Sequence, residues 1–242
     1  MKALAIATLA VAALAAVPPA RAQLAPAPYV AEYEVRYGGL SVGSSRSQLS
    51  RAPQAGRWLF ETRSTASGFA RIIAGGTLQQ RSTFELDGEA TRPLSYRFDD
   101  GTADTEHDVA LEFDWRAGRV RGTAEDAAVD VATEDGLQDA ASIQALVALR
   151  LQAGIPPGTI AMIEKDRIKR YRYTELRRER IKTALGELDT VVYRSARVGS
   201  ASTRETLSWF APSLGYLLVR AEQRQDGDRR FHTYIRRHQI AN

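Results

Sequence analysis

The segment YVAEYEVRY, residues 29–37, carries an aromatic or small apolar residue at every second position. Glu32, Glu34 and Arg36 fill three of the positions between them. This period of two predicts a β-strand with one face toward a core and the other toward water. A sheet with one wet face is typical of antiparallel proteins, so this first strand favours a mainly β fold.

The same alternation recurs along the rest of the chain, in segments separated by Gly, Pro, Asp or Ser. We predict strands over residues 29–37, 44–51, 57–66, 77–86, 92–99, 109–115, 159–164, 168–178, 187–197, 203–210, 217–221 and 231–235. Asp226-Gly227 predicts a tight type I′ turn between the last two strands, and Ala117-Gly118 gives a weaker turn signal. Consecutive strands are therefore expected to be antiparallel neighbours.

One segment, residues 139–152, has a helical pattern. Its apolar stripe consists of Ala140, Ile143, Leu146, Val147 and Leu151. Asp139 is expected to cap its start, and Gly154 followed by Pro156 is expected to end it. Ser142 stands where Glu or Gln would complete a capping box, so we expect that box to be incomplete.

These patterns predict a mainly β protein: a large curved antiparallel sheet, half-barrel or barrel-like, with one helix near residues 139–152. The length favours a single domain over residues 23–242. Residues 122–138, rich in Ala, Asp and Glu, are expected to form a loop. They would be the place of a domain boundary if there were one.

The first 22 residues, MKALAIATLAVAALAAVPPARA, have the order of a secretory signal peptide. Lys2 precedes an apolar run, and Ala20-Arg21-Ala22 is a small-x-small site, so we expect cleavage after Ala22. The run is shorter than the roughly 20 residues that span a bilayer. The chain has no Cys, hence no disulfide framework and no lipid-modified cysteine. We expect a soluble periplasmic or secreted protein that is not membrane-spanning.

Gly39-Leu40-Ser41-Val42-Gly43 matches the G-x-S-x-G motif of serine hydrolases. That motif needs a strand before it and a helix after it, and no helical pattern follows Ser41. We expect a turn between antiparallel strands and assign no catalytic residue. A serine hydrolase using Ser41 is the least favoured of the functions considered.

The sequence predicts no metal site and no cofactor. His107 stands apart from the other two histidines, and His232 and His238 would lie about 20 Å apart on one strand. A possible calcium loop lacks the EF-hand spacing, so we expect a solvated turn; its acidic residues are Asp99, Asp100, Asp104, Glu106 and Asp108. Glu32 and Glu34 are expected to face water with no shift in pKa.

Basic residues are densest between Lys165 and Lys182, where nine of them meet three acids. Those we expect to contact a polyanion are Arg170, Arg172, Arg177 and Arg178. After export the available polyanions are lipid headgroups, lipopolysaccharide or acidic polysaccharide. With 31 basic and 29 acidic side chains left after cleavage, no nucleic acid partner is expected. The alternative is a solvated strand whose charges prevent edge-to-edge association.

Trp209-Phe210-Ala211-Pro212 and Tyr216 place large apolar side chains around a strand end. Trp209 can anchor the core, with Pro212 turning the chain. In the alternative interpretation, Trp209, Phe210 and Tyr216 line a ligand cavity between the curved sheet and the helix.

Several short motifs, taken in order, resemble the bacterial domain-of-unknown-function family numbered 3108. They are Tyr33-x-Val35-x-Tyr37-Gly38-Gly39-Leu40-x-x-Gly43, Arg92-Pro93-Leu94-Ser95-Tyr96, Leu137-Gln138-Asp139-x-x-Ser142, Leu185-Gly186-Glu187-Leu188-Asp189-Thr190, Trp209-Phe210-Ala211-Pro212 and Tyr216-Leu217-x-Val219-Arg220. The resemblance runs from about residue 29 to 237. It implies an exported, β-rich envelope protein without an established activity, so it supplies no catalytic residues.

The sequence therefore favours a non-enzymatic binding or carrier module for an apolar or amphiphilic cell-envelope molecule. The alternative is an envelope assembly or structural factor that uses the basic 165–182 face to bind an anionic polymer or a protein partner.

Overall fold

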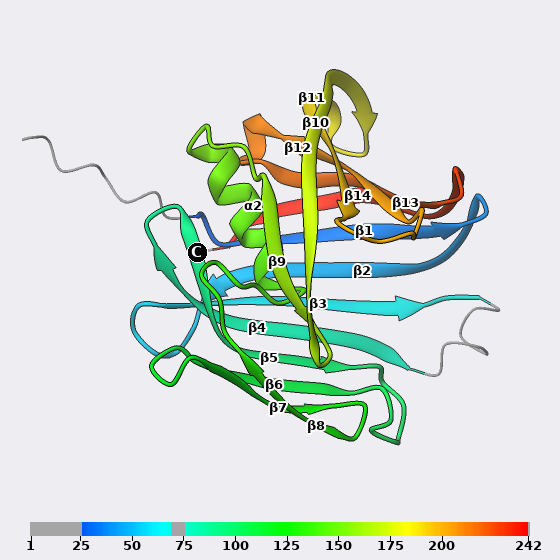
Figure 1. Cartoon of the computed structure of the whole chain (residues 1–242). Coiled ribbons are helices and arrows are strands. Elements are labelled where there is room, and N and C mark those ends of the chain that lie inside the picture. The colour runs from blue at the N-terminus through cyan, green and yellow to red at the C-terminus, as the bar shows by residue number, and fades with distance from the viewer. Residues whose placement is uncertain (1–25, 69–75, 242) are drawn as a thin grey trace, which may run out of the picture.

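Within residues 26–68 and 76–241, which the computed structural model describes, fourteen strands form one antiparallel sheet (Figure 1). The strands are β1 (Tyr29–Tyr37), β2 (Leu40–Arg51), β3 (Arg57–Ala66), β4 (Thr77–Asp87), β5 (Ala90–Asp99), β6 (Val109–Asp114), β7 (Arg119–Ala124), β8 (Ala127–Ala132), β9 (Thr159–Glu164), β10 (Arg167–Thr183), β11 (Gly186–Arg197), β12 (Glu205–Ala211), β13 (Leu217–Gln225) and β14 (Asp228–Ile240). A 3₁₀ turn, η1 (Pro212–Leu214), follows β12.

The strand order runs outward in both directions from a central pair, β1 and β14. Tyr29 lies opposite Ile240 in that pair, so the first and last strands are neighbours. Strands β8 and β9 are the two ends of the order and do not pair with each other. The prediction of a large curved antiparallel sheet is confirmed, and the sheet stays open rather than closing into a barrel.

Helix α2 (Ser142–Gln152) lies inside the curl of this sheet (Figure 1). Seven of its eleven residues are buried, because sheet elements pack on more than one side of it. Ala141 and Ala145 pack into the apolar cluster that contains Phe84 of β4. Leu146 and Val147 pack with Phe210 of β12 on the other side. The predicted helix is confirmed, with its first regular turn three residues later than Asp139.

The start of the helix is capped by Asp139. Its Oδ1 accepts hydrogen bonds from the backbone N–H groups of Ala141 and Ser142, both at 2.8 Å. In return, Ser142 Oγ accepts the Asp139 N–H at 3.1 Å. The expectation of an incomplete capping box was therefore wrong, because the short Ser142 side chain reaches back as Glu or Gln would.

Gln138 and Asp139 also fasten β9 to the strands on the opposite side of the curl. The backbone of Gln138 bonds to Ala161 and Ile163 on the outer edge of β9, at 2.9 Å each. Its side chain accepts from Thr91 Oγ1 of β5 at 2.6 Å and donates to the Thr91 carbonyl at 2.9 Å. Side-chain bonds thus join two parts of the sheet that no strand pairing joins.

Strands β7 and β8 were not predicted, and the expected loop over 122–138 is wrong in its first half. Each of these strands has six residues and few buried side chains. The turn between them consists of Glu125 and Asp126, both with positive φ, at 53° and 59°. That is type I′ geometry without the usual Asn or Gly, so the hairpin carries little sequence signal. The Asp226-Gly227 hairpin is confirmed, with φ of 53° and 81°.

The outer face of the sheet carries its own apolar cluster, centred on Trp209 and Val192. The turn end of the β10–β11 hairpin folds over this cluster through Ile181, Leu185 and Leu188. One half of the sheet is therefore covered on both faces, by α2 inside and by the hairpin outside.

The structure bears on the prediction that the chain does not span a membrane, but not on the prediction of a signal peptide. No helix in the described part of the chain is long and apolar enough to cross a bilayer. The signal peptide over residues 1–22 and its cleavage site lie outside the described residues.

Candidate functional site

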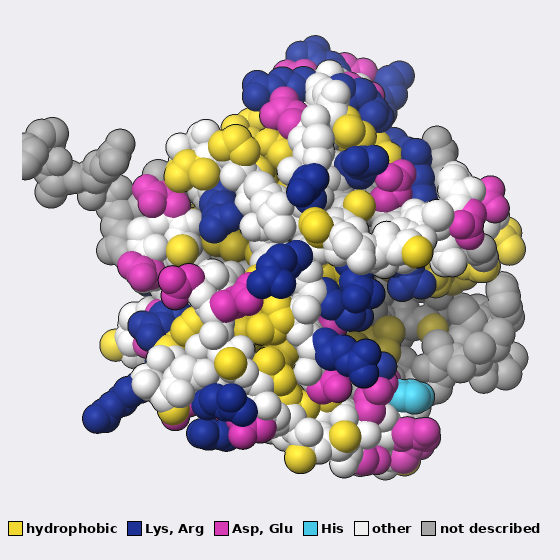
Figure 2. Space-filling view, in the orientation of Figure 1, with side chains coloured by type: hydrophobic (Ala, Val, Ile, Leu, Met, Phe, Trp, Pro, Cys, Tyr) yellow, Lys and Arg dark blue, Asp and Glu magenta, His cyan; other side chains and the backbone are white. Residues whose placement is uncertain are grey.

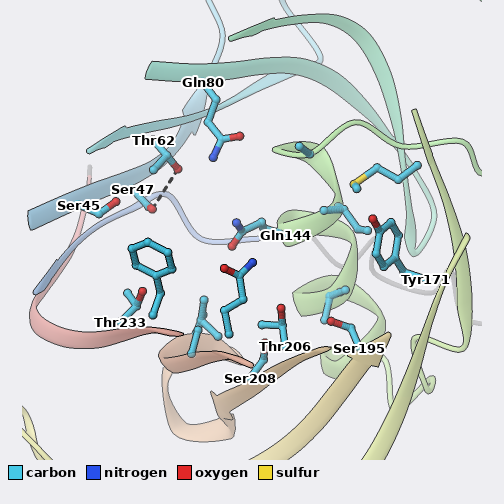
Figure 3. A pocket seen from close by; sticks show the side chains of 18 of the residues that line it. Ser45, Ser47, Thr62, Gln80, Gln144, Tyr171, Ser195, Thr206, Ser208 and Thr233 are labelled. Carbon is cyan, nitrogen blue, oxygen red and sulfur yellow. Dashed lines mark hydrogen bonds between the residues drawn. The ribbon is translucent and has the colours of Figure 1, made fainter. Parts of the chain in front are cut away.

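A hollow of about 780 Å³ lies on the concave face of the sheet, beside α2 (Figure 3). Side chains of β1–β4 form one part of its wall, and side chains of β10–β14 form another. Because side chains alternate between faces along a strand, pairs such as Ser45 and Ser47 or Thr206 and Ser208 point into it together. Figure 3 shows these two groups on different sides of the same space.

Twelve Ser, Thr and Gln side chains contribute to this wall. They are Ser45, Ser47, Thr62, Ser64, Gln80, Gln144, Ser195, Ser202, Thr206, Ser208, Gln223 and Thr233. Some already bond within the wall: Ser47 with Thr62 at 3.2 Å and Ser64 with Ser45 at 2.9 Å. These pairs lie on β2 and β3 and use up much of each other's hydrogen-bonding capacity.

The polar side chains on the other part of the wall are differently placed. Gln144 of α2, Thr206 and Ser208 of β12, Gln223 of β13 and Thr233 of β14 have no side-chain hydrogen-bond partner among the described residues. Ser208 is only 8% exposed, but its hydroxyl remains accessible from the hollow. The five groups together offer unused donors and acceptors to whatever occupies the hollow.

Apolar side chains line the hollow next to the helix. Phe60 of β3, Ile143 and Val147 of α2, Phe210 of β12 and Leu218 of β13 contribute to this part of the wall. Phe210 and Ile143 are each 7% exposed. The wall of the hollow therefore has an apolar part next to the helix and an uncharged polar part on the strands.

One ion pair stands at the β9–β10 side of the hollow. Lys169 and Tyr171 of β10 both donate hydrogen bonds to the carboxylate of Glu164. Burial alone would raise the pKa of Glu164, but the bonds from Lys169 and Tyr171 outweigh it and hold the pKa below its usual range. Burial raises the pKa of Tyr171, and the bond to Glu164 adds to the rise. This carboxylate stays ionised and engaged at neutral pH.

The three aromatic residues predicted near a cavity lie in three different places. Phe210 lines the hollow. Trp209, its neighbour on β12, points to the outer face, where its Nε1 donates to Glu179 at 2.6 Å and the Arg220 guanidinium lies 4.5 Å from its ring. Tyr216 lines a separate cavity of about 330 Å³ that Phe210 also borders.

The basic residues of β10 are mostly paired with carboxylates. Arg170 donates to Glu134 at 2.7 and 2.8 Å, Arg177 to Glu179 at 3.0 Å and Arg178 to Glu175 at 3.1 Å. Arg172 is exposed and pairs with no carboxylate in the described part of the chain. Figure 2 shows acidic side chains among the basic ones at the β10–β11 end of the molecule. The positive charge of the sequence is thus partly neutralised in space.

Ser41 lies on β2, exposed, just after the β1–β2 turn. Gly38 and Gly39 form that turn with φ of 55° and 87°. The strand continues to Arg51 with no helix after Ser41, so the G-x-S-x-G match is a hairpin feature, as expected. The other two histidines both lie on β14. His232 bonds to Tyr234 at 2.8 Å, and His238 lies beside Tyr29 of the neighbouring strand β1.

Three aspartates of the predicted acidic loop lie close together. Asp99, Asp100 and Asp108 bring carboxylate oxygens within 4.8 Å of one another, and Asp100 accepts bonds from Thr102 within its own turn.

The expectation that Glu34 has an ordinary pKa was wrong. A hydrogen bond from Arg36 at 2.9 Å, together with a contact from Arg236, lowers the pKa of Glu34 to about 2.

The hydroxyl-bearing wall was not foreseen from the sequence. Its signal was present, because Thr206 and Ser208 share the face of Phe210 by strand alternation. Small polar residues on the face of a strand that is predicted to point inward indicate a hollow there rather than a packed apolar core.

Comparisons with known proteins give a family and a fold. A family model described as "Protein of unknown function (DUF3108)" matches residues 32–232. No curated protein matches the chain. A β-barrel-like protein of domain of unknown function DUF1849 from Brucella abortus has a similar fold, with a TM-score of 0.57 and 10% identity over 89% of this chain and 98% of that one.

Two further solved structures are more distant. A protein of Parabacteroides distasonis, provisionally described as a lipoprotein, gives a TM-score of 0.38 at 10% identity over 88% of this chain and 96% of its own. A protein of Bacteroides fragilis, provisionally described as exported and with a YmcC-like fold, gives 0.40 at 10% identity over 87% and 95%.

Proposed function

The chain belongs to the DUF3108 family of proteins of unknown function, and we propose that it is a non-enzymatic binding protein for an amphiphilic molecule of the cell envelope. The hollow of about 780 Å³ on the concave face is the observation that carries this proposal. Its volume lies in the range of about 300–1,000 Å³ that is typical of small-molecule sites.

The wall supports an amphiphile rather than a purely apolar ligand. A ligand in the hollow would displace water from its apolar wall, which favours binding. Phe60, Ile143 and Phe210 would contact an apolar group. Thr206 and Ser208 would meet a polar one, since their hydroxyls have unused hydrogen-bonding capacity.

The side chains around the hollow support binding rather than catalysis. No histidine is among the residues that line it. Its two carboxylates are engaged: Glu164, half-buried, is bonded to Lys169 and Tyr171, and Glu205 pairs with Arg194, so neither resembles a free general base.

The site of action is part of the proposal. The signal-peptide pattern of residues 1–22 supports export and cleavage after Ala22, giving a mature periplasmic or secreted protein that begins at Gln23. N-terminal sequencing of the protein recovered from the periplasm tests this: a start at Met1 would contradict it.

The anionic-polymer alternative is less well supported than the hollow. It depends on the basic residues of β10, and three of the four arginines named for it are paired with carboxylates of the same chain. A lipopolysaccharide or acidic polysaccharide would have to displace those pairs.

Native mass spectrometry of the mature protein, purified from the periplasm without detergent, tests the proposal when followed by organic extraction. We expect a stoichiometric bound amphiphile. The variant Thr206→Trp, which places a large ring in the hollow, should lose it. The matched control Thr123→Trp, on the exposed face of β7, should keep it. A bare chain mass for the wild type, or equal retention by both variants, would contradict the proposal.

A further inference from the structure

Five Ser, Thr or Gln side chains in the hollow have no side-chain hydrogen-bond partner among the described residues. They are Gln144, Thr206, Ser208, Gln223 and Thr233. A hydroxyl or a carboxamide both donates and accepts hydrogen bonds. Its best match is a ligand group that also does both, which is the property of a sugar hydroxyl. Phosphate, sulfate and carboxylate groups only accept, and proteins usually bind them through Arg, Lys or backbone N–H groups.

The cations at the hollow are Lys169, Arg197 and Arg204. Lys169 is bonded to Glu164. Arg197 and Arg204 also line the hollow, but both are exposed, so they stand where it opens to solvent. Arg204 stands two residues before Thr206, so a comparison of sulfate with sugar head groups decides between the two kinds of polar partner.

We infer that the polar part of the ligand is an uncharged saccharide, carried on an apolar chain that contacts Phe210 and Val147. This inference rests on the proposed function and names the ligand class of the same hollow. The residues with unused hydrogen-bonding capacity lie on β12, β13, β14 and α2, and the apolar wall is contributed by α2 and β12 beside them. A glycosylated amphiphile would use both at once.

Amphiphiles with one alkyl chain and different head groups test the inference by isothermal titration calorimetry. The probes are octyl β-glucoside, octyl sulfate and octyltrimethylammonium, each below its micelle concentration, with methyl β-glucoside as the sugar without a chain. We expect octyl β-glucoside to bind at least tenfold more tightly than each of the other three. Because the chain is constant, the differences among the octyl compounds report on the head group alone.

The double variant Thr206→Val with Thr233→Val removes two hydroxyls with little change in shape. It should weaken octyl β-glucoside binding about tenfold and leave octyl sulfate binding unchanged. Thr123→Val on β7 is the matched control, and thermal melting of each variant checks that it is folded.

Each alternative outcome has a distinct meaning. Equal or tighter binding of the sulfate or the ammonium compound would overturn the saccharide inference while leaving an amphiphile-binding hollow. Methyl β-glucoside binding as tightly as the octyl form would overturn the requirement for an apolar chain. No binding by any probe would count against the proposed function itself.

Discussion

Asp139 supports a sharp prediction about stability and pH. Its carboxylate is fully buried and accepts hydrogen bonds from Ser82 Oγ at 2.6 Å and from the N–H groups of Ala141 and Ser142. Burial raises its pKa from an ordinary 3.8 to about 6, and these hydrogen bonds offset only part of the rise. The structure therefore holds a carboxylate whose ionisation opposes folding.

The sign and size of the effect follow from this raised pKa. Well below pH 3.8 the residue is protonated in both the folded and the unfolded states. As the pH rises from 3.8 to about 6, the unfolded state ionises first, and the free energy of unfolding falls. A difference of about two pKa units corresponds to a loss of roughly 3 kcal/mol at neutral pH.

The substitution Asp139→Asn isolates this contribution. The amide oxygen can still accept from Ala141 and Ser142, and the amide nitrogen can donate to Ser82. We expect the wild type to gain on the variant by about 1–2 kcal/mol between pH 7 and pH 5, measured by urea unfolding with tryptophan fluorescence. The comparison cancels His238, whose pKa is lowered by burial and whose contribution has the opposite sign.

Asp139→Ala is the contrasting variant, since it also removes the cap and leaves Ser82 without its partner. It should lose about 1–3 kcal/mol relative to Asp139→Asn at every pH. If the wild type and Asp139→Asn showed the same pH dependence from pH 5 to pH 7, the argument from the buried carboxylate would be refuted.

Four further substitutions test the space at two glycines, the place of Trp209 and the bond between Thr91 and Gln138. Gly122→Ala should destabilise the protein by about 1–3 kcal/mol in urea unfolding, because a Cβ there would lie 1.9 Å from the Ala110 carbonyl oxygen. Gly56→Ala, with φ of 79° but open space around it, should lose only about 1 kcal/mol, and equal losses would contradict this. Trp209→Phe should leave ligand binding in the hollow unchanged, since the ring lies on the outer face. A large loss of affinity would contradict this position of the ring. Thr91→Val should lower the unfolding free energy by about 1–3 kcal/mol by leaving the buried Gln138 Oε1 without its donor, and a neutral effect would show that this contact does not fasten β9.

The strands could be predicted because their signal is local. The alternation in residues 29–37 and the Asp226-Gly227 turn are visible without knowing the partner strand, and both are confirmed. The β7–β8 hairpin was not predicted, because the turn residues Glu125 and Asp126 adopt positive φ although they are not the Asn and Gly that usually indicate such a turn. The cover of the outer face by Ile181 and Leu188 depends on how a long hairpin folds over the sheet, which no local pattern contains.

The site was harder to predict than the fold. Trp209 and Phe210 were grouped by their sequence position, yet strand alternation sends neighbours to opposite faces. The hydroxyls of Thr206 and Thr233 come together only because β12 and β14 curl around one space. Polar residues in an alternating strand suggest solvent, and only the curvature of the sheet shows that these face a hollow on its concave side.

A crystal structure of the mature protein, purified from the periplasm without detergent or added ligand, tests the central claim most directly. The account predicts electron density for an amphiphile in the hollow, with its apolar part against Phe210 and Val147 and its polar part within hydrogen-bonding distance of Thr206 or Ser208. A hollow closed by collapsed side chains, or a ligand bound elsewhere on the molecule, would contradict it.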